Sequence, residues 1–531
     1  METPALREQR NSPPCRGGLG SAHERCGARC GGHWRRTAAP ALRVRYGPVR
    51  GRGLPLPGEG NIAVTTEAID RGARPWQQRS GTLDRVDAAV ITVIGALTLV
   101  IGGVRATRNS FWVDEAATGV FMRSSFRGML SLLWNKHGMG PYYACLWFWT
   151  RLGHSDWWLR GFSILGGTLA AVALYYLARL FCTRAVAVIA AGLFLCHPQF
   201  LMNLTNARDY SWLMFVAVLG VVCVMKQVES PTVARAIWCG VVNGTLLALN
   251  PLTAPLLAME WLWGMRESSG RAARQKMFGS AVLSMLLFLP FVHGLFTEEG
   301  LDWIPGLTTT TFWSDTLDFM GGAWWASVLA AGNLALVVLF VARRLPRSAS
   351  SRSVLLVAGW VVTPLALAVV STVKPLFISR YMLHALPLLV LGAAAGFGAL
   401  TVAARSAQPS LRRVASVTLA AAVVAAVLSF PYARFGAYGN IQDLRGVARV
   451  LEADQQPGDR YLFSPGWSYW LVGYYWPAPD GSVVTTIDGL APATRVWLID
   501  LDRAGRDAVE DGVVVSRHPL ANADVVELRV G

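Results

Sequence analysis

Two adjacent acids stand directly after the first long apolar segment of this sequence. Asp114 and Glu115 lie in the stretch Phe111–Ala116, beside Phe111 and Trp112, which are residue types common at membrane interfaces. A carboxylate in such a partly apolar setting suits a general base that takes a proton from a sugar hydroxyl. For an isolated Asp-Glu pair the simpler interpretation is a solvated acidic loop, so the surrounding sequence has to decide between the two.

Further polar and aromatic residues lie near the expected outer ends of the apolar segments. They are His137, Tyr142, Tyr143, Arg160, Arg208, Asp209, Tyr210, Lys374 and Arg380. Ionisable residues at the edge of a bilayer are costly unless they are paired or functional. A single arginine there usually just extends toward the lipid headgroups, but several can hold an anionic group through forked hydrogen bonds. For several cations on the same face as an acid pair, an anion-binding site and simple extension toward the headgroups are equally good interpretations.

The composition indicates a polytopic membrane protein. The chain has 531 residues, of which only 15% are charged, and its mean hydropathy is +0.37. Soluble domains carry about 25% charged residues. The net charge of +16 lies mostly in the N-terminal segment and in short loops, where basic residues set the orientation in a membrane. We therefore expect the lipid bilayer as a partner, and no nucleic acid.

The chain divides into three parts by composition. Residues 1–85 are rich in Arg, Gly and Pro and lack the apolar core of a signal peptide, which predicts a disordered basic cytoplasmic tail or an overextended gene start. Residues 86–430 hold the apolar segments. Residues 431–531 have the pattern of a small α/β domain, with a helix near 441–451 and strands over 461–463, 496–499 and 525–530.

About eleven membrane spans are predicted in the second part. Their approximate bounds are 86–104, 159–181, 185–201, 211–227, 234–249, 252–265, 277–295, 326–341, 354–372, 381–403 and 414–430. Basic residues gather in alternate loops, which would be cytoplasmic. With an odd number of spans, the N-terminus would be cytoplasmic and the C-terminal domain extracytoplasmic.

The first external loop, residues 105–158, holds the acid pair. It also holds an apolar stretch at 142–152 that is too short to span, and this stretch is predicted to lie in the interface, with a tilted span as the alternative. The predicted fold is thus mostly α: a polytopic membrane protein of about 11 transmembrane helices with a small C-terminal α/β extracytoplasmic domain.

Five short segments resemble the GT-C fold glycosyltransferases of the family 39 type. They are the first-loop acidic motif Phe111–Ala116, Lys136–Tyr143 (similar to His-Pro-Pro-Leu-Tyr-Tyr), Trp158–Ser163 (similar to Leu-Arg-Leu-Pro-Ser), Asn206–Ser211 (similar to Glu-Ala-Arg-x-Tyr-Ala) and Ser379–Leu383 (similar to Pro-Arg-Tyr-Leu). The group contains protein O-mannosyltransferases, the bacterial lipid A aminoarabinose transferase and actinobacterial mannosyltransferase-like proteins. The segments come in the expected order within residues 86–430, although Gly138, Gly140 and Asn206 depart from the usual pattern.

The resemblance implies a hexosyl- or pentosyltransferase in the plasma membrane of a bacterium. It would move a sugar, with mannose the first choice, from a polyprenyl-phosphate donor to a hydroxyl of a protein, glycan or glycolipid acceptor on the outer face. Asp114 would be the catalytic base, and Glu115 would orient or share its proton. The substrate-binding residues would be His137 and Tyr143, which shape the cleft, Arg208, Tyr210 and Arg380, which bind the donor phosphate, and in addition Tyr142, Arg160 and Lys374. No cofactor is firmly implied, although a divalent metal near the acid pair would find suitable oxygen ligands.

Two other functions stay open. A transporter or flippase of lipid-linked sugars would place its charges near the bilayer midplane, often with internal repeats. Here the charges lie at predicted helix ends and no repeat is evident, which favours the enzyme. A non-catalytic membrane scaffold that displays the C-terminal domain would tolerate replacement of Asp114 and Glu115.

Overall fold

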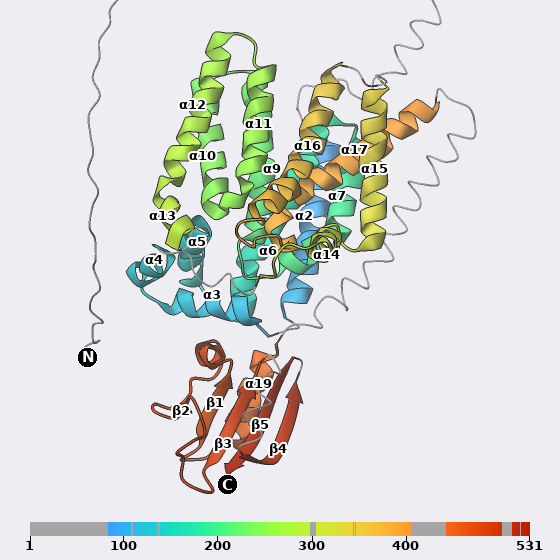
Figure 1. Cartoon of the computed structure of the whole chain (residues 1–531). Coiled ribbons are helices and arrows are strands. Elements are labelled where there is room, and N and C mark those ends of the chain that lie inside the picture. Colours follow the sequence, from blue (N-terminus) through green and yellow to red (C-terminus); the bar gives the residue numbers. More distant parts are fainter. Residues whose placement is uncertain are drawn as a thin grey trace, which may run out of the picture. The chain divides into compact units, whose positions relative to one another are not determined.

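A computed structural model describes residues 83–107, 110–134, 139–297, 304–342, 345, 347–405, 442–501, 512–520 and 522–531 (Figure 1). The predicted N-terminal tail up to residue 82, His137 and the last predicted span at 414–430 lie outside these residues.

Helices make up most of the described chain. The first are α2 (Arg85–Ala106), α3 (Val113–Arg123), α4 (Phe126–Trp134), α5 (Gly140–Thr150), α6 (Asp156–Phe181), α7 (Arg184–Cys196), α8 (Pro198–Leu204), α9 (Tyr210–Glu229) and α10 (Val233–Leu249). They are followed by α11 (Ala254–Glu267), α12 (Arg271–Phe288), α13 (Val292–Thr297), α14 (Thr309–Phe319), α15 (Ala323–Val341), α16 (Arg347–Val370), the 3-10 helix η3 (Ser379–Ala385) and α17 (Leu386–Arg405).

Within the described residues, seven helical segments are long and apolar enough to cross a membrane. These are α2, α6, α9, α12 with α13, α15, α16, and η3 with α17. Helices α7 and α8, bent by 63° at their junction, form an eighth candidate. Helices α10 and α11 are shorter, with 17 and 14 residues. Ten of the eleven predicted spans thus correspond to helices, and the polytopic, mostly α-helical fold is confirmed.

Polar contacts join helix ends that the charge pattern assigns to one face of the membrane. The buried carboxylate of Asp87, in the first turn of α2, accepts hydrogen bonds at 2.9 Å from the Nε atoms of Arg179 and Arg184. Arg352 of α16 donates from Nη1 to the carbonyl of Leu180 at 3.0 Å. The starts of α2, α7 and α16 and the end of α6 therefore meet, as the alternation of basic loops predicts.

Helices α15 and α17 approach each other closely because small residues face one another. A Cβ atom on Gly396 would lie 1.8 Å from the carbonyl oxygen of Gly332, which leaves no room for a side chain. Asn333 of α15 also donates from Nδ2 to the carbonyl of Leu389 at 3.0 Å. This contact fixes α17, and with it the preceding turn η3, which carries Arg380.

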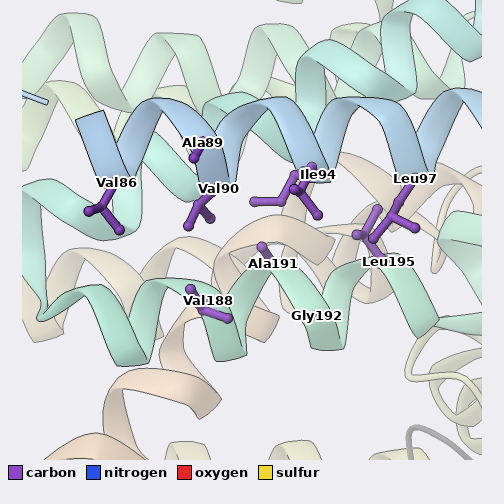
Figure 2. Close-up of a pocket in the computed structure, with 10 residues that line it drawn as sticks. Val86, Ala89, Val90, Ile94, Leu97, Val188, Ala191, Gly192 and Leu195 are labelled. Carbon is purple, nitrogen blue, oxygen red and sulfur yellow. The ribbon is translucent and has the colours of Figure 1, made fainter. Parts of the chain in front are cut away.

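An apolar groove of about 360 Å³ runs between α2 and α7. Figure 2 shows Val90, Ile94 and Leu97 of α2 opposite Val188 and Leu195 of α7. Its ten lining residues are all apolar or glycine, which fits a surface that faces lipid chains. None of the predicted site residues lines this groove.

The C-terminal residues form a helix and a five-stranded sheet. Helix α19 (Leu444–Asp454) is followed by strands in the spatial order β2 (Val483–Val484), β1 (Arg460–Ser464), β3 (Arg495–Asp500), β5 (Ala523–Val530) and β4 (Gly512–Leu520), and a short helix α20 (Tyr469–Val472) lies between β1 and β2 in the chain. Strand β1 is parallel to β2 and β3, whereas β5 is antiparallel to β3 and β4. The three predicted strands correspond to β1, β3 and β5, which confirms a small C-terminal α/β part.

Candidate active site

The acid pair lies in the first turn of α3, where carboxylates interact favourably with the helix dipole. Successive residues of a helix point about 100° apart, so the two side chains face different partners. Asp114 Oδ2 lies 3.3 Å from Nη1 of Arg380, whereas Glu115 Oε2 lies 2.6 Å from Nη2 of Arg160. The predicted acid pair therefore consists of two separate ion pairs.

Glu115 holds four segments of the chain together. Its carboxylate accepts two forked hydrogen bonds from Arg160 of α6, at 2.9 and 2.6 Å, and a third at 2.9 Å from the amide of Ala207, just before α9. Arg160 also donates to the carbonyls of Ala106 and Ser110, each at 2.9 Å. The end of α2, the start of α3, α6 and the segment before α9 are thus fixed around one buried ion pair.

The Asp114–Arg380 pair is far more accessible than the Glu115–Arg160 pair. The side chains of Asp114 and Arg380 are 27% and 24% exposed, against 2% and 4% for Glu115 and Arg160. The Arg380 guanidinium also lies 6.0 Å from the ring centre of Trp112, within the range of a cation–π contact. Of the two acids, Asp114 is therefore the one that is open to solvent.

Arg208 brings a second cation to the same region. Its Nη1 donates to the hydroxyl of Tyr143 at 3.1 Å, and its Nε has no hydrogen-bond partner within the described residues. Burial raises the pKa of Tyr143, which keeps its hydroxyl protonated at neutral pH. Both Arg208 and Asp114 act on Tyr143 electrostatically, which places the acid and this arginine near the same tyrosine.

Thr118 and Ser163 complete the polar lining, and neither was predicted from the sequence. The Thr118 hydroxyl lies 3.3 Å from that of Tyr143. Its position four residues after Asp114 on α3, hence on the same helix face, is a signal that could have identified it. Ser163 lies 3.4 Å from the hydroxyl of Tyr142 and donates to the carbonyl of Arg208 at 3.1 Å. Both predicted tyrosines therefore hold Arg208 in place, one at its guanidinium and one through Ser163.

Asp209 and Tyr210 stand at the start of α9 and are both buried. The Oδ1 atom of Asp209 has no hydrogen-bond partner among the described residues. Tyr210 is within electrostatic range of Arg380, Arg208 and Asp114, and so is Tyr381, the residue after Arg380. We refer to Asp114, Thr118, Tyr143, Arg208, Asp209, Tyr210, Arg380 and Tyr381 as the Asp114 cluster.

Asp209 makes the cluster sensitive to pH. Burial raises its pKa from 3.8 to about 6, because the charged form loses its hydration. The unfolded chain therefore gives up this proton at lower pH than the folded protein does, and folding stability falls as the pH rises from about 4 to about 6. The Asp209→Asn variant has no carboxyl group to titrate at this position. Its free energy of unfolding should therefore exceed that of the wild type by up to about 3 kcal/mol at pH 7.

Thermal unfolding of the purified protein in detergent between pH 4 and pH 7 measures this difference. The difference in unfolding midpoint between Asp209→Asn and the wild type should be small at pH 4 and should increase up to about pH 6. A gap that stays constant over the whole range would contradict a buried, titrating Asp209.

Among the described residues, Lys374 is a predicted site residue that has no hydrogen bond or ion pair with the cluster. Lys374 lies between α16 and η3, and it forms no ion pair with any described residue. His137 lies outside the described residues, as does most of the stretch before Met139. Their predicted substrate-binding roles stay predictions.

A divalent metal at the acid pair fits the geometry poorly. Glu115 uses both carboxylate oxygens to pair with Arg160, so it does not offer a second carboxylate beside Asp114. Among the residues that the structure describes, no group of three or more His, Cys, Asp or Glu side chains could hold a metal ion. We therefore derive no step that uses a metal.

Solved structures with a similar fold are known. ArnT from Cupriavidus metallidurans in the apo state has a TM-score of 0.54 and 14% identity, over 83% of this chain and 98% of ArnT. ArnT from the same organism bound to undecaprenyl phosphate gives 0.53 and 13%, over 82% of this chain and 97% of ArnT. The arabinofuranosyltransferase AftD from mycobacteria gives 0.50 and 16%, over 86% of this chain but only 40% of AftD.

No protein-family model matches this chain, and no curated protein sequence matches it. At identities of 13–16% the likeness to the solved structures concerns the fold alone. It agrees with the helices long enough to span a membrane and with the family that the five sequence segments resemble. The chain is therefore a multi-pass membrane protein with the GT-C fold of membrane glycosyltransferases.

Proposed function

We propose that this protein is a glycosyltransferase that moves a sugar from a polyprenyl-phosphate donor to an acceptor hydroxyl. The observation that carries the proposal is one accessible carboxylate, Asp114, that forms an ion pair with Arg380 and lies within electrostatic range of Arg208. A carboxylate can activate a hydroxyl, and paired arginines suit the oxygens of a phosphate. The similar ArnT structure was solved with undecaprenyl phosphate bound, a ligand of the same class as the proposed donor.

In the proposed reaction, the acceptor hydroxyl gives its proton to Asp114 as its oxygen bonds to the anomeric carbon of the sugar. The bond between that carbon and the donor phosphate oxygen breaks, and its electron pair stays on the phosphate. Arg208 and Arg380 stabilise this growing negative charge, which is usually a large contribution to catalysis. Attack from the side opposite to the phosphate inverts the anomeric centre.

Glu115 has a positioning role in this proposal rather than a share in the proton transfer. Its two oxygens are already engaged by Arg160 and the Ala207 amide, and its side chain is 2% exposed. By holding Ala207 against α3, it sets the distance between Asp114 and the neighbouring Arg208. Arg160, which is buried and bonded to Glu115, likewise has a positioning role in this proposal and does not bind the substrate.

The finer assignments follow the sequence resemblance. We propose mannose as the donor sugar, a protein, glycan or glycolipid as the acceptor, and the outer face of a bacterial plasma membrane as the place of reaction. The C-terminal domain would then lie outside the membrane and the N-terminus in the cytoplasm.

Membranes that contain the overexpressed protein, supplied with radiolabelled polyprenyl-phosphate mannose, test the proposal. We expect the label to leave the lipid and to appear in a water-soluble or protein-bound product. Polyprenyl-phosphate arabinose run in parallel distinguishes a pentosyl donor. A label that crosses the membrane while still attached to its lipid would instead identify a flippase.

Arg208→Lys tests the phosphate-binding role of the forked side chain. Lysine keeps the charge but cannot donate to Tyr143 and to a phosphate oxygen in the same geometry. We expect sugar transfer to fall roughly ten- to a hundredfold, the range for loss of a hydrogen bond to a charged group. Initial rates over a series of donor concentrations measure the effect, and Arg235→Lys, in an exposed helix end, is the matched control. Equal rates in the Arg208→Lys variant and the wild type would contradict the role.

A further inference from the structure

The chain that leads into α3 is held by residues from the far end of the sequence. The amide of the fully buried Phe111 donates to the hydroxyl of Tyr475 at 2.9 Å. Ser110 Oγ donates to the carbonyl of Gln442 at 3.2 Å. The Phe111 ring also packs on Tyr474, with ring centres 5.2 Å apart. The C-terminal part of the protein thus contacts the backbone three residues before Asp114.

The Tyr475 hydroxyl is itself anchored. It forms a short hydrogen bond with the carboxylate of Asp156, the first residue of α6, and the same carboxylate pairs with Arg445 of α19. Because the hydroxyl donates to Asp156 and accepts from Phe111, it uses its single proton and one lone pair in fixed directions. Tyr475 therefore connects α6, α19 and the segment before α3.

The surface of α3 is shaped to receive this contact. A Cβ atom on Gly119 would lie 2.5 Å from Cε2 of Tyr474, so only glycine lets the ring approach the helix. Arg123, one turn further along α3, lies with its guanidinium 4.2 Å from the Tyr474 ring centre and donates to the Tyr474 carbonyl at 2.9 Å. Two independent features of α3 therefore fit the tyrosine pair of the C-terminal part.

We propose that Tyr475 is a positioning residue that sets the location of Asp114 through the Phe111 amide. A buried amide that loses its hydrogen-bond partner moves or admits water to recover one. Either response displaces the first turn of α3, and a shift of about 1 Å at a catalytic group is enough to slow a reaction strongly. The catalytic consequence rests on the proposed transferase function, whereas the structural consequence does not.

Hydrogen–deuterium exchange of the full-length protein in detergent tests the structural part directly. Tyr475→Phe removes only the hydroxyl, so peptides that cover Phe111 to Glu115 should exchange at least tenfold faster than in the wild type. Tyr469→Phe is the matched control, because the Tyr469 side chain is 51% exposed and its hydroxyl makes no hydrogen bond within the described residues. Equal exchange in the two variants would overturn the proposal, whether or not the protein is a transferase.

Kinetics of sugar transfer test the catalytic part. We expect Tyr475→Phe to lower kcat about three- to tenfold while KM for the donor lipid stays unchanged, because the described hydrogen bonds of Tyr475 go to Phe111 and Asp156 and not to the arginines that bind the phosphate. If Tyr475 acts through Asp114, the variant Asp114→Asn with Tyr475→Phe should be no slower than Asp114→Asn alone. A further loss in that double variant, or a raised KM, would show that Tyr475 acts in another way.

Gly119→Ala tests the fit between α3 and the tyrosine pair. Alanine has a higher helix propensity than glycine, but its methyl group at position 119 would displace Tyr474. We therefore expect kcat to fall and hydrogen–deuterium exchange over Phe111 to Glu115 to become faster. Gly103→Ala in α2 is the control, because a Cβ atom there meets nothing within 4 Å. If both alanine variants behave like the wild type, the close contact at Gly119 does not position the site.

Discussion

Asp114→Asn abolishes nearly all sugar transfer, with an expected loss of about 10²–10⁴-fold in kcat, the range for a positioned general base. Asparagine keeps the shape of the side chain and a hydrogen-bond acceptor toward Arg380, but it cannot take a proton. The side chain of Asp114 is 27% exposed, so its carboxylate is open to solvent. Release of labelled sugar by membranes that contain the variant or the wild type measures the effect.

The matched control for this experiment is Asp318→Asn, because Asp318 is an exposed acid at the end of α14. Its rate should equal that of the wild type. Transfer by Asp114→Asn at the rate of this control would exclude Asp114 as the base. Lipid-donor binding that persists in the inactive Asp114→Asn variant would show that the loss lies in the chemical step.

Glu115→Gln has the largest expected effect on stability. It leaves the Arg160 guanidinium, 4% exposed, without its counter-ion, and removal of one partner of a buried ion pair costs about 3–5 kcal/mol. We expect a markedly lower midpoint of thermal unfolding in detergent and a small yield of folded protein. Glu229→Gln is the control, because the Glu229 side chain is 33% exposed and pairs with Lys226 at 2.9 Å and with Arg352 at 4.0 Å, and such surface pairs contribute about 1 kcal/mol or less.

A second substitution separates the ion pair from the rest of the site. Glu115→Gln combined with Arg160→Met removes both charges and should be more stable than Glu115→Gln alone, because no uncompensated charge is left in the interior. Equal unfolding midpoints for Glu115→Gln and the wild type would mean that the buried Glu115–Arg160 ion pair does not support the fold.

The sequence predicts the order of the spans and the acid with its two arginines, because both depend on local patterns. Apolar segments of about 20 residues and alternating basic loops identify the helices, and the segments around Asp114, Arg208 and Arg380 lie at their ends. The strands β1, β3 and β5 follow from runs of apolar residues. The roles of the neighbours of Asp114 are harder to predict.

Glu115 illustrates why the roles of the residues next to Asp114 are hard to predict. Its place next to Asp114 in the sequence predicts a shared function, but the turn of about 100° between successive helical residues directs it toward Arg160, 45 positions away in the chain. Tyr475 is 364 positions from Phe111, and nothing in its local pattern distinguishes it from Tyr474 or Tyr469. Such pairings are set by how the helices and the C-terminal sheet pack, and a single sequence does not encode them in any local spacing.

The order in which the ribosome makes these residues gives the Tyr475 contact a further meaning. Asp114 is synthesised first, Arg208 and Arg380 follow, and Tyr475 is made after all of them. Domains generally fold from the N-terminus as synthesis proceeds. The nascent chain therefore carries Asp114 before Tyr475, the residue that holds the Phe111 amide, has been made. A chain that stops before Tyr475 would insert into the membrane without that contact.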